Sequence, residues 1–85
     1  MKTFADTAAD FVPACERVFG MRPRVLDGGR AVLLDDLKLS LESGEHELWL
    51  IEMHGALEHR LGMVEVKGQI EGALREAKEL LDEHG

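Results

Sequence analysis

The chain has 85 residues, of which 45% are hydrophobic and 32% are charged. This length leaves room for one hydrophobic core, so we expect a single domain over residues 1–85. The composition is that of a folded globular chain and excludes a disordered one. Seventeen acidic against ten basic residues give a net charge of −7, and no stripe of Lys and Arg is present. Direct nucleic-acid binding is therefore not expected.

The single cysteine, Cys15, cannot form a disulfide within the chain. A lone thiol is typical of proteins in reducing compartments. Asp6 and Asp10 interrupt any signal-peptide core, and no apolar run approaches the length of a membrane span. We therefore expect a cytoplasmic protein that does not associate with a membrane.

Apolar residues at steps of three and four predict an amphipathic helix in the first twenty residues. They are Phe4, Ala8, Phe11, Val12, Cys15, Val18 and Phe19. Gly20 is the expected stop. Pro13 lacks an N–H and crowds the carbonyl four residues before it, so the helix either bends there or begins near Asp10.

Four antiparallel strands are predicted next. Glycines in residues 27–30 favour a tight hairpin between strands at 24–26 and 31–34. Residues 37–42 alternate apolar with polar, which indicates a strand with one buried face. Residues 46–53 follow a turn and complete a meander, which helices must cover on its apolar side.

The last element is predicted to be an amphipathic helix. Its apolar residues step by three and four through Met63, Val66, Ile70, Ala73, Ala77 and Leu80, and Leu74 and Leu81 widen the stripe. The expected fold is α+β: an N-terminal helix, a four-stranded antiparallel meander and a C-terminal amphipathic helix.

No enzyme signature is present. His54 and His59 are five residues apart, which does not place two metal ligands on one helical face. Cys15 lies on the apolar stripe of the first helix, where an inert buried thiol is usual. The acidic pairs at 35–36 and 45/47 are expected to be solvated turn residues. We expect no catalytic residue, no bound metal and no cofactor.

The strand at 46–53 is apolar on both faces, with Leu48 and Leu50 on one side. The other side carries Trp49, Ile51 and Met53. Either the helices and the curvature of the domain cover this additional apolar surface, or the surface forms a docking site for another polypeptide. We predict the second, with the partner-binding residues Trp49, Ile51, Met53, Val25, Val32 and Leu34.

The order of elements resembles that of the class I type III secretion chaperones, the Tir chaperone family. The resemblance covers a helix ending at Gly20, a strand–turn–strand at 25–36, the alternating strand at 37–42 and an apolar strand at 48–55. Family members carry a middle helix and two further strands before the last helix. Here residues 56–62 run almost directly into the closing helix, so the elements that form the family's dimer are missing or rebuilt.

The resemblance implies non-enzymatic binding of the N-terminal segment of a secreted effector protein, which is kept extended, soluble and competent for export. It also implies a homodimer. The alternative function is a small structural or regulatory subunit that oligomerises or docks through its C-terminal amphipathic helix. A second alternative is a metal- or ligand-dependent enzyme that uses His46, His54 or His59.

Overall fold

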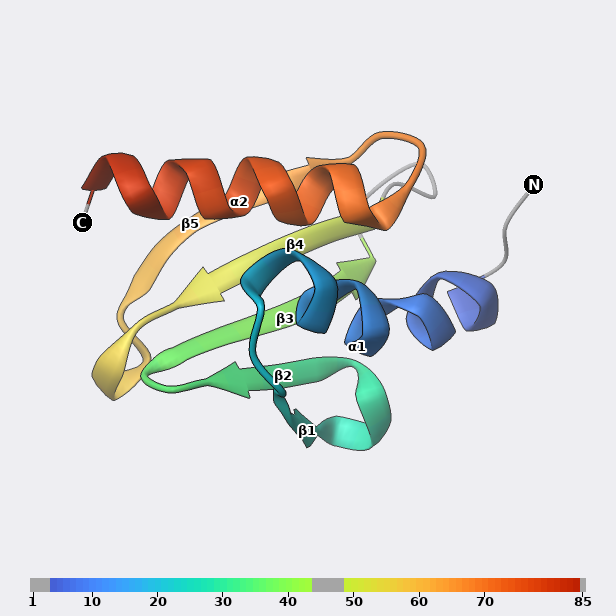
Figure 1. The fold of residues 1–85 in the computed structure, drawn as a ribbon, viewed down its shortest axis with the longest axis horizontal. Helices are drawn as coiled ribbons and strands as arrows, with labels where there is room; N and C mark the ends of the chain where they lie inside the picture. Colours follow the sequence, from blue (N-terminus) through green and yellow to red (C-terminus); the bar gives the residue numbers. More distant parts are fainter. Residues whose placement is uncertain (1–3, 44–48, 85) are drawn as a thin grey trace.

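The computed structural model describes residues 4–43 and 49–84. The fold is α+β, with two helices on one face of an antiparallel meander (Figure 1). The five strands pair in sequence order, β1-β2-β3-β4-β5. The helices are α1 (Phe4–Phe19) and α2 (Ile70–His84), and the strands are β1 (Arg24–Leu26), β2 (Ala31–Leu34), β3 (Leu37–Ser43), β4 (Trp49–His54) and β5 (Arg60–Val66).

Helix α1 has the predicted extent. It ends at Phe19, and Gly20 follows with a φ of +67°, donating its N–H to the carbonyl of Glu16 at 2.9 Å. The left-handed conformation that terminates the helix is one that glycine adopts without strain. Pro13 lies inside the helix, so the alternative start near Asp10 is wrong.

The sheet has five strands, and the prediction of four was wrong. The fifth, β5, includes Met63 and Val66, which the sequence analysis had assigned to the closing helix. A step of three residues from Met63 to Val66 suits a helix, but Val64 and Val66 are buried while Glu65 between them is exposed. This alternation is that of a strand with one covered face. Helix α2 begins only at Ile70.

The other predicted strands are present. A 3-10 turn at Asp27–Gly29 joins β1 to β2, with positive φ at Gly28 (+67°) and Gly29 (+98°), which accounts for the two glycines. Strand β3 covers the predicted alternating segment, with Leu39 and Leu41 buried. Strand β4 begins at Trp49, and the start predicted at residue 46 lies outside the described residues.

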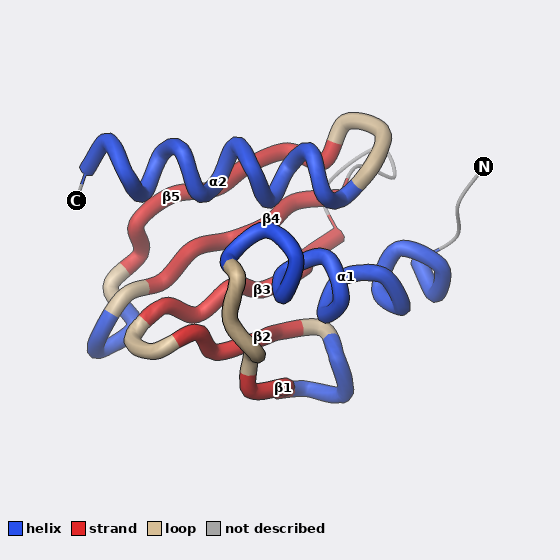
Figure 2. Tube along the Cα trace, in the orientation of Figure 1, coloured by secondary structure: helices blue, strands red, loops and turns tan. Residues whose placement is uncertain are grey.

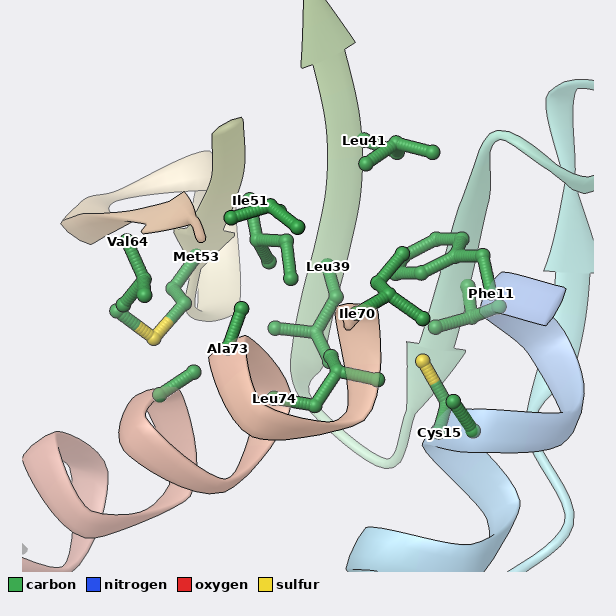
Figure 3. Close-up of a cluster of buried hydrophobic side chains, with 14 of the residues drawn as sticks. Phe11, Cys15, Leu39, Leu41, Ile51, Met53, Val64, Ile70, Ala73 and Leu74 are labelled. Carbon is green, nitrogen blue, oxygen red and sulfur yellow. The ribbon is translucent and has the colours of Figure 1, made fainter. Parts of the chain in front are cut away.

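The core lies between the helices and the sheet (Figure 3). Helix α1 contributes Phe11 and Cys15, and α2 contributes Ile70 and Leu74. The central strands meet them with Leu39, Leu41, Ile51, Met53 and Val64. Burying a side chain of this size contributes about 1.5–3 kcal/mol relative to leaving it exposed. This packing holds α2 on the sheet.

The opposite face of the sheet is more polar. In β4 the residues that alternate with the core positions are Leu50, Glu52 and His54, and all three are half-buried. Figure 2 shows both helices on the other side. The helices therefore cover the Ile51 side of β4, and the Leu50 side is left partly exposed.

Candidate functional site

Four of the six predicted partner-binding residues lie in the core. Val32, Leu34, Ile51 and Met53 are each no more than 4% exposed. The sequence analysis expected their side of the sheet to stay open to a partner. Two helices packed on that one side enclose these side chains, so they form no free surface of this chain.

The other two predicted partner-binding residues, Trp49 and Val25, do not lie on a common surface. Trp49 is half-buried and packs against the core from β4. Val25 is 50% exposed on the edge strand β1. Strands β2 and β3 separate them in the sheet, so the structure does not bring these two residues together.

An apolar hollow in the described surface lies elsewhere. At one end of the molecule, the β2–β3 turn, the β4–β5 connection and the C-terminal end of α2 meet (Figure 1). Two adjoining hollows there, of about 520 and 390 Å³, share Leu61 and Leu81 as lining residues. We call the pair the end groove. Its apolar lining includes Leu37, Met53, Leu61, Met63, Leu80 and Leu81.

The β4–β5 connection, which lines the smaller hollow with Gly55 and Ala56, also carries an unusual leucine. Leu57 is fully exposed in a 3-10 turn at Ala56–Glu58, and its φ is +60°. The left-handed conformation costs a residue with a Cβ about 1–2 kcal/mol. Leu61 and Met63, at 47% and 43% exposure, extend the apolar surface along β5.

A bulge explains how Leu61 reaches the groove. Met53 pairs with Gly62 and His54 pairs with Arg60, so Leu61 is the extra residue on the β5 side. Bulges bend a strand and re-aim a side chain. The Leu61 side chain lies over Gly55, where an added Cβ would be 3.5 Å from Leu61 Cδ1. This is an ordinary van der Waals distance, so a small side chain would fit at residue 55, whereas a Cβ at Gly62 would lie 3.3 Å from Met53 Cε and would force that side chain to shift.

The rim of the groove is acidic at the smaller hollow and basic at the larger one. Asp35 and Asp36 line the smaller hollow, whereas His59 and Arg60 line the larger. The guanidinium of Arg60 donates to the Sδ of Met63 at 3.6 Å. Among the side chains that the structure describes, which do not include those of residues 4–8, 58 and 84, no carboxylate pairs with Arg60, and no base pairs with Asp35 or Asp36.

No three of the described His, Cys, Asp or Glu side chains gather as a metal site. The predicted burial of Cys15 is confirmed, and burial raises the pKa of its thiol to about 12. His54 Nε2 lies 3.8 Å from a carboxylate oxygen of Glu52, and its Nδ1 is buried without a hydrogen-bond partner. His46 lies outside the described residues.

The groove was not predicted because residues 56–62 were interpreted as a short connection. One signal was present in the sequence: the six-residue segment between Gly55 and Gly62 contains two leucines, Leu57 and Leu61, that belong to no predicted helix or strand.

Neither helix of the described chain is long and apolar enough to span a membrane. Comparison of the chain with protein families, with curated proteins and with solved structures gives no match in any of the three.

Proposed function

We propose that this protein is a non-enzymatic binding domain that holds an extended apolar segment of a partner protein in the end groove. The observation that carries the proposal is the pair of adjoining hollows that share Leu61 and Leu81, together with Leu57, which is fully exposed on left-handed backbone in the connection that lines the smaller hollow. Its side chain adds nothing to the core of this chain, and a strained, exposed apolar residue of this kind supports a role in a contact outside the fold.

An extended partner suits the groove because its two hollows adjoin at one end of the sheet. The smaller hollow is lined by the β2–β3 turn and the larger by the first residues of β5, and Leu61 and Leu81 line both. A segment that occupies both hollows therefore crosses the ends of the strands in an extended conformation.

The resemblance to the type III secretion chaperones gives this binding a biological role. In that role the partner is the N-terminal segment of a secreted effector, kept soluble and export-competent, and the chaperone is a homodimer. A net charge of −7 favours the solubility of such a complex. Sedimentation velocity over a range of concentrations tests the dimer.

The alternative function through the C-terminal helix has less support. Ile70, Ala73, Leu74 and Ala77, which form most of the apolar stripe of α2, are buried against the sheet and α1. Only Leu80 and Leu81 stay half-buried at the end of the helix, and both line the end groove. The part of the helix still available to a partner therefore belongs to the proposed site.

The test is the binding of fluorescein-labelled 12-residue peptides with alternating leucine and serine, followed by fluorescence anisotropy. The double variant Leu57→Ser, Leu61→Ser should weaken binding at least fivefold, because it removes two exposed anchors. The matched control is Val25→Ser, which removes an apolar side chain about as exposed as Leu61 at the opposite edge of the sheet. Equal affinity of all three proteins, or no binding by any of them, would contradict the proposal.

A further inference from the structure

The charges on the rim of the end groove are separated by sign. Asp35 and Asp36 form the two-residue turn between β2 and β3, and they line the smaller hollow. His59 and Arg60, at the start of β5, line the larger hollow. Leu61 and Leu81, which line both hollows, lie between the acidic and basic parts of the rim.

These groups have no opposite charge to pair with in the described chain. The carboxylate of Glu71 is held by Arg17 and Arg75, and Asp10 is also paired with Arg17. Arg60 has only the weak contact to the sulfur of Met63, although a guanidinium carries five N–H donors. The turn carboxylates are likewise unpaired among the described residues.

We propose that the segment held in the groove is bipolar: an apolar centre with a basic residue over Asp35 and Asp36 and an acidic residue beside Arg60. This inference rests on the proposed function and names the chemistry of its partner. The apolar centre lies over Leu61 and Leu81, and the terminal charges fix which end of the segment lies on which hollow. Charge complementarity of this kind sets orientation and specificity more than total affinity.

The two ends together predict weaker binding of a uniformly charged segment. A uniformly acidic segment places a carboxylate over Asp35 and Asp36, and a uniformly basic segment places a cation beside Arg60. Each pairing is exposed, so one favourable contact contributes about 0.2–1 kcal/mol, which is about a 1.4- to 5-fold change in affinity. Salt screens such contacts, so the discrimination falls at high ionic strength.

The experiment uses four labelled 12-residue peptides that share one alternating leucine core. One is bipolar with Lys at one end and Glu at the other, one has only the Lys, one has only the Glu, and one has Gln at both ends. Anisotropy titrations at low and high salt give the four affinities for the intact protein. The bipolar peptide should bind tightest, with a 1.4- to 5-fold loss for each charge removed.

Two isosteric charge variants assign the contacts. Arg60→Gln should abolish the advantage of the bipolar peptide over the Lys-only peptide. The double variant Asp35→Asn, Asp36→Asn should abolish its advantage over the Glu-only peptide, and asparagine tolerates the positive φ of residue 35. The controls Lys67→Gln and Glu42→Gln change exposed charges at the other ends of β5 and β3 and should have no effect.

The outcomes separate this inference from the proposed function. If all four peptides bind equally well, the groove binds apolar segments and only the bipolar inference fails. If no peptide binds, the proposed function fails as well. If the protein self-associates and the bipolar peptide displaces the second copy, the groove is occupied by another copy of this chain, and the inference is overturned.

Discussion

The Nε of Arg17 donates a hydrogen bond to Oε1 of Glu71 at 2.7 Å and so joins α1 to α2. Arg75 donates to the other oxygen of the same carboxylate at 3.0 Å. The hydrogen bond from Arg17 is the main cause that lowers the pKa of Glu71, and the charges of Arg75 and Arg17 add to it. This pairing lies on the outside of the contact between the helices, whereas the core residues lie beneath it.

The lowered pKa of Glu71 predicts a contribution to stability that depends on pH. Because the folded pKa is below the ordinary value of 4.5, the contribution is present above that value and is lost as the pH falls through the folded pKa. Glu71→Gln should therefore reduce stability at neutral pH and flatten its dependence on pH below about 4.5. Urea unfolding at several pH values measures this, with Glu79→Gln as the exposed control. Parallel curves for the wild type and Glu71→Gln would refute it.

The strained backbone at Leu57 predicts opposite effects on stability and binding. Leu57→Gly removes a left-handed penalty of about 1–2 kcal/mol and adds about 0.4–1 kcal/mol of chain entropy in the unfolded state. The protein should become more stable by about 0.5 kcal/mol while it loses affinity for the leucine peptides. Leu57→Ala is the matched variant: it loses the same side chain but keeps the strain. If Leu57→Ala gained stability as well, the gain in Leu57→Gly would not come from relief of backbone strain.

The burial of Ile51 distinguishes the core from the docking surface that the sequence indicated. Ile51→Ala should lower the free energy of unfolding by about 2–5 kcal/mol, because it leaves a cavity in the core. Leu61→Ala, at an exposed position, should lower it by much less. Chemical denaturation measures both. An Ile51→Ala protein with unchanged stability but lost peptide binding would restore the original prediction for this residue.

The thiol of Cys15 should be unreactive in the folded protein. Its pKa of about 12 and its burial leave almost no accessible thiolate near neutral pH. A disulfide-exchange reagent such as DTNB should react only as fast as the protein opens, and rapidly in denaturant. A prompt stoichiometric reaction in native buffer would show that the first helix does not cover this residue.

Periodicity correctly predicted those elements whose spacing of apolar residues fits only one kind of secondary structure. The alternation in residues 37–42 and the three- and four-residue steps in residues 4–19 gave β3 and α1 with nearly their observed bounds. The steps through Met63 and Val66 fitted both a helix and a strand with one buried face. Pairing with β4 decides between them, because Val64 lies opposite Ile51 and Val66 opposite Trp49.

The sequence by itself therefore determined the α+β class, the order of most elements and the burial of Cys15. These follow from the spacing of side chains along one segment, which depends only on neighbouring residues. The candidate groove was decided by the tertiary structure alone. An antiparallel meander brings the β2–β3 turn, the β4–β5 connection and the end of α2 to one end of the molecule. The proximity of these three segments cannot be predicted from the pattern of side chains within any one of them, because it results from the packing of the whole chain.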